Sequence, residues 1–324
     1  MLFYAGIDEA GYGPMLGPLC IGSTLFKVND CDPAAGAPDL WSLLEEAVCR
    51  RPTDKKRRIA IDDSKTLKGA RGSKAHPLRH LERGVLAFMQ AGLGIMPETD
   101  DELLSALDAG ITPDPWYSDE SVALPLSGEQ GEHRIAAAML QRSLDAAGIE
   151  ICQLNCEVIH PHQINAASLS RERKSDLNLG AALRLAERIR ADHPNDHPRV
   201  VIDRQGGRSS YREHLALAWP DASIRVLGET GRISRYRVES PEGILTISFE
   251  AESEQNHLPV ALASMIAKLV RELHMIRLNR FFAMQIPELK PTAGYVQDGR
   301  RFMQEVEGLV KSMKLDESRL VRRV

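Results

Sequence analysis

The start of the chain places two adjacent acids between a predicted strand and a glycine-rich turn. Apolar residues 2–7 lead into Asp8 and Glu9, and three glycines follow before the next apolar run at residues 19–28. This pattern favours two strands joined by a turn. Neighbouring strand residues face opposite sides, so Asp8 and Glu9 can share a site only if the strand bends at Glu9, and the glycines make such a bend easy.

A glycine-rich turn is also found in nucleotide-binding loops, which is the alternative interpretation. The segment GYGPMLG lacks the Lys-Ser/Thr pair of a P-loop, and two carboxylates would repel phosphate in the absence of a metal ion. An aspartate at a strand end is, taken singly, more often a turn or cap residue than a ligand. A carboxylate site therefore requires partners from elsewhere in the chain.

Composition indicates a globular protein. The 324 residues are 43% hydrophobic and 27% charged, which suffices for one large domain or two modest ones. No window offers the roughly 20 unbroken apolar residues of a membrane span, and the first residues lack the layout of a signal peptide. Five scattered cysteines favour reduced thiols. We therefore expect a cytoplasmic protein with no membrane association.

Charge is distributed unevenly along the chain. Residues 92–133 carry ten acids and no Lys or Arg, and the remainder holds 35 acids against 41 basic residues. Residues 50–83 contain twelve Lys or Arg and four acids. The net charge of −4 is thus compatible with a basic body that binds a polyanion. The acidic segment should face away from such a substrate or meet a basic partner.

The order of predicted elements indicates an α/β fold. Apolar runs ending on Asp, at RRIAIDDS (57–64) and RVVIDRQ (199–205), predict strands, and residues 221–251 predict strand and hairpin. Apolar spacing predicts helices at 181–191 and 259–282, where Pro259 suits the first turn. We expect one catalytic domain over 1–324, with an inserted lobe at about 92–134 and a helical C-terminal segment at about 260–324.

Five motifs resemble those of the type 2 and type 3 ribonucleases H. They are GIDEAGYGPMLGPL, DDSKTL, VVIDRQGG, HLPVALASMIAKLVRE and TAGYVQDGRRFM, and they run in family order from residue 5 to about residue 303. The resemblance implies a ribonuclease H-like mixed sheet flanked by helices, here with an acidic insertion and a helical C-terminal region. Chance does not produce five such matches in order.

The resemblance also implies four catalytic acids that bind two Mg2+ or Mn2+ ions. Three of them are Asp8, Glu9 and Asp203. The fourth stands ten residues before the Ser of the Ala-Ser helix motif, which selects Glu254. Glu252 lies in a type 3-like context two residues out of register, and Glu272 is a weaker alternative.

The implied reaction is hydrolysis of the RNA strand of RNA-DNA hybrids, or of ribonucleotides embedded in DNA, with one ion activating water and the other stabilising the leaving oxygen. The resemblance implies no obligate protein partner. Ser264 and Lys268 either reach the nucleic-acid backbone or form a solvated helix face. A hybrid-binding protein without catalysis is the alternative. The implied substrate-binding residues are Gly11, Tyr12, Gly13, Ser64, Lys65 and Tyr295.

The motifs are a mosaic of the two types. Type 2 enzymes usually have Asp as the fourth acid and Arg between the two glycines, whereas this chain has Glu254 and Tyr12. Glu as the fourth acid is usual in type 3 enzymes. Those enzymes, however, typically carry a further N-terminal domain, and the first motif here begins at residue 5. The preferred substrate therefore stays open. Recognition through the backbone of residues 11–13 tolerates Tyr12, because only RNA offers a 2'-hydroxyl.

Overall fold

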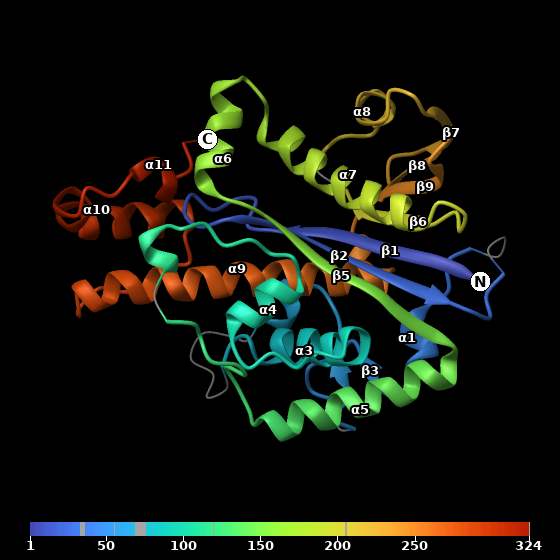
Figure 1. Ribbon diagram of the computed structural model, residues 1–324, viewed down its shortest axis with the longest axis horizontal. Helices are drawn as coiled ribbons and strands as arrows, with labels where there is room; N and C mark the ends of the chain where they lie inside the picture. Colours follow the sequence, from blue (N-terminus) through green and yellow to red (C-terminus); the bar gives the residue numbers. More distant parts are fainter. Residues whose placement is uncertain (33–35, 55, 69–75, 119, 205, 324) are drawn as a thin grey trace.

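A seven-stranded mixed sheet forms the centre of the protein. The computed structural model describes residues 1–32, 36–54, 56–68, 76–118, 120–204 and 206–323, so Gln205 of the VVIDRQGG motif lies outside the described residues. The strand order is β5-β2-β1-β6-β9-β8-β7 (Figure 1). The strands are β1 Leu2–Ala10, β2 Leu19–Val28, β5 Ile149–Ile159, β6 Arg199–Asp203, β7 Ser223–Glu229, β8 Ile233–Ser240 and β9 Gly243–Glu250.

Strand direction brings the carboxyl ends of three strands to one edge. β1 pairs in parallel with β6, and β6 pairs in parallel with β9, whereas β2 runs antiparallel to β1. Ile7 is opposite Ile202, so Asp8 and Asp203 each lie one position further along their strands. The ends of neighbouring parallel strands meet at the same crevice. The two aspartates therefore meet there.

Helices cover both faces of the sheet (Figure 1). One face carries α3 Arg79–Leu93, α5 Gln130–Ala147 and α9 Leu258–Gln285, and the other carries α6 Pro161–Leu169, α7 Lys174–Asp192 and α8 Arg212–Ala218. Alternate residues of β1 enter the two cores: Tyr4 packs with residues of α3 and α9, whereas Ile7 packs with residues of α7. This alternation is the period of two that a strand buried on both faces requires.

Helix α9 packs unusually close to β1 and β2. A Cβ atom at Gly6 would lie 2.2 Å from the Pro259 carbonyl carbon, and one at Gly22 would lie 2.2 Å from the Ala263 carbonyl oxygen. Only glycine permits such an approach of two backbones. Gly22 is the register partner of Asp8, so the close packing brings the first turns of α9 beside that acid.

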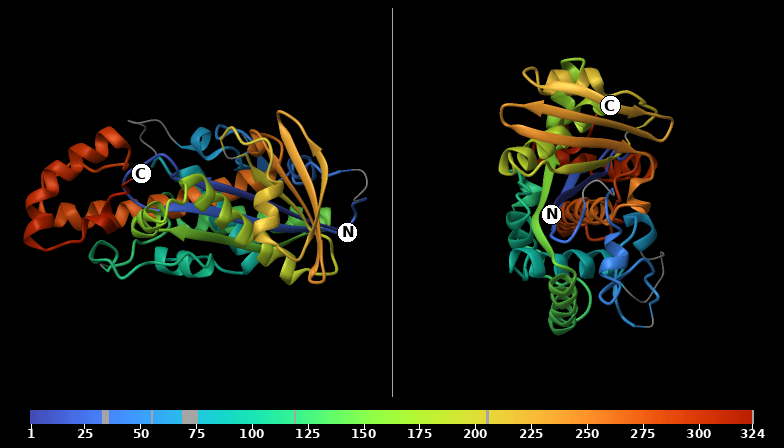
Figure 2. Two further views of the ribbon diagram at one scale, coloured as in Figure 1. Left: turned by 90° about the horizontal axis from the view of Figure 1, so that it is seen from above. Right: turned by 90° about the vertical axis from the view of Figure 1, so that its right-hand side faces the viewer.

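The C-terminal helices form a third apolar cluster beyond the end of the sheet. Helices α10 Val296–Ser312 and α11 Glu317–Leu320 project at one end of the molecule, and β7–β9 lie at the other (Figure 2). Phe282 of α9 and Phe302 of α10 meet in this cluster, and Leu16 joins it from the turn after β1. The short elements are α1 Leu40–Leu43, β3 Val48–Cys49, β4 Ile59–Ala60, α2 Ser64–Leu67, α4 Asp100–Ala106, η2 Pro115–Tyr117 and η3 Ser253–Gln255.

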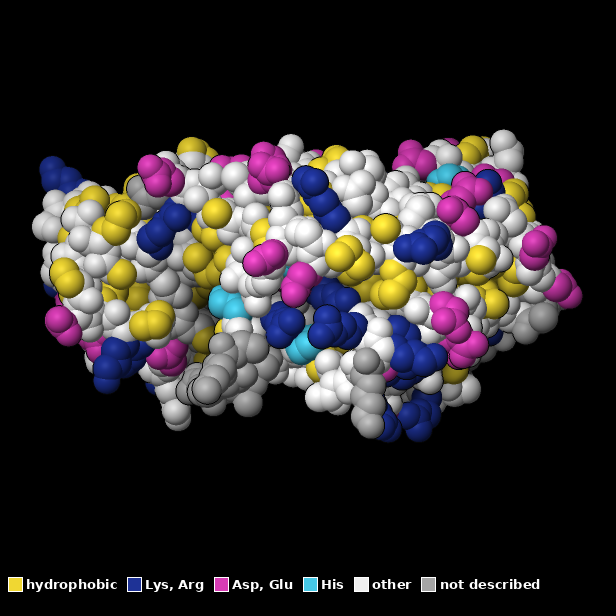
Figure 3. Space-filling model, turned by 90° about the horizontal axis from the view of Figure 1, so that it is seen from below, with side chains coloured by type: hydrophobic (Ala, Val, Ile, Leu, Met, Phe, Trp, Pro, Cys, Tyr) yellow, Lys and Arg dark blue, Asp and Glu magenta, His cyan; other side chains and the backbone are white. Residues whose placement is uncertain are grey.

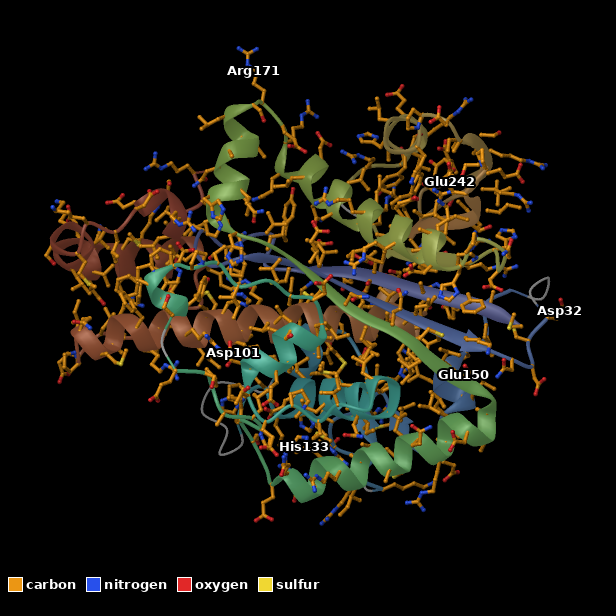
Figure 4. All side chains as sticks on the ribbon, viewed as in Figure 1. Asp32, Asp101, His133, Glu150, Arg171 and Glu242 are labelled. Atoms are coloured by element: carbon orange, nitrogen blue, oxygen red, sulfur yellow. The ribbon has the colours of Figure 1, made fainter. Side chains whose placement is uncertain are left out.

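The acidic segment 92–133 packs against the body of the protein. Asp100 is buried and accepts hydrogen bonds of 2.6 Å from Nε and Nη2 of Arg277 on α9. Asp101, on α4 where this helix lies over α9 in Figure 4, pairs with the same guanidinium at 2.5 Å. The segment therefore meets a basic partner within its own chain. The division of the chain into one domain with an inserted lobe stays a prediction.

The mixed sheet with flanking helices and a helical C-terminal region confirms the predicted fold class. The strand predicted at 57–64 shrinks to Ile59–Ala60, because residues 64–67 form α2 instead. Lys and Arg side chains gather near the middle of the face shown in Figure 3. Within the described ranges, no helix is long and apolar enough to cross a membrane.

Candidate active site

A single cleft collects all ten residues predicted to form the site. Its volume is about 270 Å³, and it opens at the edge where β1 and β6 end. The predicted residues come from positions 8 to 295, and the cleft walls bring them together without exception. They are Asp8, Glu9, Gly11, Tyr12, Gly13, Ser64, Lys65, Asp203, Glu254 and Tyr295.

Asp8 and Glu9 reach the cleft from opposite sides of β1. The strand keeps its pairing with β2 through Ala10, so no break in the register at Glu9 brings the two side chains to one face. Asp8 points toward Ser264 of α9, and Glu9 points toward Asn178 of α7. The cleft wraps around the end of the strand, and both carboxylates line it. The predicted requirement of a bend is therefore wrong, because the site lies at the edge of the sheet and not on one face.

Glu254, and not Glu252, faces the other acids. The 3-10 turn η3 follows β9 and is tied to Asp203, whose Oδ1 accepts hydrogen bonds from N and Oγ of Ser253 at 3.0 and 2.9 Å. Glu254 lines the cleft. Glu252 precedes the turn in a left-handed conformation and pairs with Arg232 at 3.2 Å on the exposed surface. The geometry thus favours the predicted register.

The acids of the cleft destabilise one another's charges. Burial raises the pKa of Asp8 well above its usual range, and the charges of Glu9 and Asp203 add to that effect. Burial likewise raises the pKa of Glu9 to about 7. The pKa of Glu254 rises to about 7 through burial and the neighbouring Asp203. Clustered carboxylates of this kind are stabilised by protons or by cations.

The donor set matches a hard divalent cation in its chemistry but not in its spacing. Four carboxylates line one small cleft, and oxygen ligands are what Mg2+ and Mn2+ prefer. The buried Oε2 of Glu254 makes no hydrogen bond within the described part of the chain, so it is available as a ligand. Among the described residues, no three acidic, histidine or cysteine side chains lie close enough to complete a ligand set by themselves.

Two lysines and two serines from α2 and α9 also line the cleft. Ser64 and Ser264 are buried, and their hydroxyls lie 3.1 Å apart, which joins α2 to α9. The two lysines are Lys65 and Lys268. Glu272 does not line the cleft: it pairs with Lys268 at 2.6 Å and Lys68 at 2.9 Å. Although burial opposes the change, these lysines lower the pKa of Glu272 to about 2.

Gly11, Tyr12 and Gly13 form the rim of the cleft beside Tyr295. Gly11 has a φ of +89°, and a Cβ there would lie 2.5 Å from the Arg271 side chain, so glycine is required on both counts. The Tyr12 ring is partly exposed, and the ammonium of Lys174 lies 4.6 Å from its centre. Tyr295 precedes α10 and is 55% exposed, which leaves its ring free for contact with a ligand.

Sequence reasoning missed three contributors. Asp63 lines the cleft and caps α2 by accepting a hydrogen bond from Lys65 N at 3.1 Å. Ser253 orients Asp203, and Asn178 of α7 lies beside Glu9. The Asp before Ser-Lys is a recognisable cap signal. The other two depend on which segments pack together, and no local pattern reveals that.

Comparisons with known proteins concern the fold. No protein-family model matches the sequence, and no curated protein matches it. RNase HII from Archaeoglobus fulgidus, solved with PCNA, is 16% identical, with a TM-score of 0.42 over 99% of this chain and 95% of that one. RNase H3 from Aquifex aeolicus is 16% identical, with a TM-score of 0.42 over 98% and 71%. Bst-RNase HIII with Mn2+ is 14% identical, with a TM-score of 0.43 over 99% and 66%.

These are the two types of ribonuclease H that the motifs resemble. At such identities and TM-scores the similarity carries no weight on activity. The function must be inferred from the side chains of the cleft.

Proposed function

We propose that the protein is a metal-dependent endoribonuclease that hydrolyses the RNA strand of RNA-DNA hybrids, or ribonucleotides embedded in DNA. One observation supports this most: four acids from three separate segments of the chain line a cleft whose rim is glycine backbone. Hydrolysis of a phosphodiester requires a cation, which the acids would hold, and recognition of a ribose requires a close approach of backbone groups. The acids and the glycine backbone both line this cleft, whose volume is about 270 Å³.

Asp8, Glu9, Asp203 and Glu254 would hold Mg2+ or Mn2+. When bound, two such ions supply Lewis acidity toward water and the phosphodiester. Ser253 keeps Asp203 oriented through two hydrogen bonds. Lys65 and Lys268 line the same cleft, Lys268 paired with Glu272, and would place ammonium groups near a phosphate of the substrate.

The residues at the rim of the cleft would recognise RNA. The backbone of Gly11 and Gly13 carries no side chain to keep a ribose at a distance, so its polar groups can pair with a 2'-hydroxyl. The exposed ring of Tyr295, beside these glycines, offers an apolar face to a sugar. A deoxyribose in the same place would leave the backbone groups unpaired.

The test uses three labelled duplexes of one sequence: an RNA-DNA hybrid, a DNA duplex with one ribonucleotide, and a DNA duplex. We expect cleavage of the first two with Mg2+ or Mn2+ and none of the third. The ratio of the first two rates assigns the type. Binding of the hybrid without cleavage under any metal would favour the alternative, a catalytically inactive hybrid-binding protein, and cleavage of the DNA duplex would contradict the role of the rim.

A further inference from the structure

Arg322, which follows α11, forms several hydrogen bonds with the glycine-rich turn after β1. We call residues 11–17 the glycine loop. The Arg322 side chain is 5% exposed, and its Nη1 donates to the Gly11 carbonyl at 2.5 Å. Its Nε and Nη2 donate to the Gly17 carbonyl at 2.8 and 2.6 Å. Its backbone N–H donates to Met15 O at 2.9 Å. One residue therefore binds both ends and the middle of the loop.

A second guanidinium supports the same loop. Arg271 of α9 donates from Nη2 to the Leu16 carbonyl at 3.0 Å and to the Ala293 carbonyl at 3.2 Å. The Gly294 carbonyl accepts hydrogen bonds from the N–H groups of Met15 and Leu16 at 2.8 and 3.2 Å. The Leu16 side chain is fully buried among the C-terminal helices. The backbone of the glycine loop is thus held by hydrogen bonds at Gly11, Met15, Leu16 and Gly17.

Among the described residues, no carboxylate pairs with either guanidinium group. Neither Arg271 nor Arg322 makes an ion pair with a carboxylate in the described part of the chain. Burial and the charge of Arg271 lower the pKa of Arg322 to about 9. Two like charges buried side by side are costly unless strong hydrogen bonds offset the loss of hydration. Here backbone carbonyls of the loop provide those bonds.

The hydrogen bond from Arg322 to the Gly11 carbonyl also affects the N–H group of Tyr12. The Gly11 carbonyl shares a peptide unit with the Tyr12 N–H, and both residues line the cleft. A charge-assisted hydrogen bond at the carbonyl polarises the unit and strengthens its N–H as a donor. The guanidinium also fixes the distance between Gly11 and Gly17, and so the width of the loop. Such support from outside the contact shell is what keeps a recognition site in its productive geometry.

We propose that Arg322 is a positioning residue, which holds the glycine loop in the shape that lets its backbone meet the ribose of the substrate. This inference rests on the proposed function, because the ribose is the ligand that the loop would recognise. Arg322 touches no substrate itself and acts only through Gly11 and Gly17. Its partner atoms lie 311 and 305 positions earlier in the chain.

The test compares Arg322→Gln and Arg322→Lys with the matched control Arg323→Gln. Glutamine removes the charge, and lysine keeps it but replaces the planar fork with one ammonium group, which cannot reproduce the three bonds from Nε, Nη1 and Nη2. Arg323 is exposed, so its side chain is a neutral place for the same change. At a temperature where all variants are folded, we expect both Arg322 variants to lose about tenfold in kcat on the hybrid, with Mn2+ affinity unchanged. The control should stay within about twofold.

A purely structural role makes a different prediction. In that case both Arg322 variants unfold at lower temperature but cleave normally per folded molecule, and this result would overturn the proposal. Full rescue by Arg322→Lys would also overturn it, since charge without the forked hydrogen bonds would then suffice.

Hydrogen exchange separates this inference from the proposed function. Amide exchange in residues 11–17 is measured without substrate, and we expect it to be about tenfold faster in Arg322→Gln than in Arg323→Gln. If the natural protein cleaves no hybrid but exchange changes as expected, the proposed function fails and the positioning of the loop stands. Unchanged exchange in Arg322→Gln would refute the positioning whatever the activity.

Discussion

At the residue scale, Asp8 illustrates how a cluster of buried carboxylates destabilises the protein that carries it. Its pKa is raised by burial and by Glu9 and Asp203, so the folded protein disfavours the ionised side chain. Asp8→Asn removes that charge. We expect the metal-free variant to be more stable than the natural protein at pH 8, by about 1 kcal/mol.

The pH dependence of this gain follows from the direction of the shift. The folded protein holds the Asp8 proton to a higher pH than the unfolded chain, whose pKa is near 3.8. Stability is therefore lost as the pH rises from about 4 and the loss is complete above the folded pKa, so the gain from Asn should fade as the pH falls toward 4. Denaturant unfolding in a chelating buffer measures it. If Asp8→Asn were less stable than the natural protein at pH 8, the ionised carboxylate of Asp8 would not be destabilising the fold.

The fourth acid can be tested by a pair of matched substitutions. Glu254→Gln removes a carboxylate that lines the cleft, whereas Glu252→Gln removes one that pairs with Arg232 on the surface. We expect the first to lower hybrid cleavage by more than about 100-fold and the second to change it less than about twofold. Loss of cleavage in Glu252→Gln alone would move the site by two residues.

Sequence motifs could locate the acids of the site but not the residues that hold them in place. Asp8, Glu9 and Asp203 follow apolar strands, which is a local pattern. The bond from Arg322 to Gly11 spans 311 positions, and no local pattern predicts it. The same holds for Ser253 and Asp203, whose contact depends on the parallel pairing of β6 and β9.

At the scale of elements, the packing of α9 on the sheet determines where Ser264 and Lys268 lie. Gly22→Ala would place a Cβ 2.2 Å from the Ala263 carbonyl oxygen, so the helix must move. We expect a loss of about 3 kcal/mol in the free energy of unfolding and a marked loss of activity. Thermal and denaturant unfolding measure the first.

Gly131→Ala is the control for that change. Gly131 lies in α5 with no atom within 4 Å of an added Cβ, so alanine should stabilise the helix by up to about 1 kcal/mol. If Gly22→Ala were equally harmless, the close approach of α9 to β2 would be wrong.

The elements with strong periodicity were predictable. The apolar run 19–28 coincides with β2, and the helix predicted at 259–282 lies within α9. The strand at 57–64 was overpredicted, because Asp63 caps a helix at a point where the apolar run suggested extended chain. The expected bend at Glu9 failed for a tertiary reason: the cleft is open to both faces of the sheet, so alternation does not separate the two acids.

At the scale of the whole molecule, two buried histidines should make the fold sensitive to acid. Burial lowers the pKa of His160 and of His274 to about 4 in each case. The unfolded chain binds these protons near pH 6.5, so stability falls as the pH drops from 6.5 toward 4. Each histidine should cost on the order of 3 kcal/mol at the acid end.

The measurement is the NMR titration of the two imidazoles in the folded protein. We expect no change in their ring signals between pH 7 and about 5. Titration near pH 6.5 would mean that the rings are hydrated. The carboxylates of the cleft have raised pKa values and shift stability in the opposite direction, which makes direct titration of the rings the cleaner experiment.

The distribution of charge over the molecule shows the limit of composition alone. The acidic segment 92–133 could be read from the sequence, and its burial against Arg277 could not, because the salt bridge to Asp100 joins residues 177 positions apart. This pair neutralises the buried Asp100 within the chain itself. The net charge of −4 therefore says little about the surface that nucleic acid would meet.

In the proposed function, the four acids of the cleft carry metal-dependent cleavage of RNA in a hybrid. The most direct measurement is the cleavage rate of one labelled RNA-DNA hybrid by the natural protein and by Asp8→Asn, each with Mg2+, with Mn2+ and with chelator. We predict cleavage only by the natural protein and only with metal, with a loss of more than about 100-fold in the variant. Cleavage that survives the chelator, or that Asp8→Asn retains, would contradict the account.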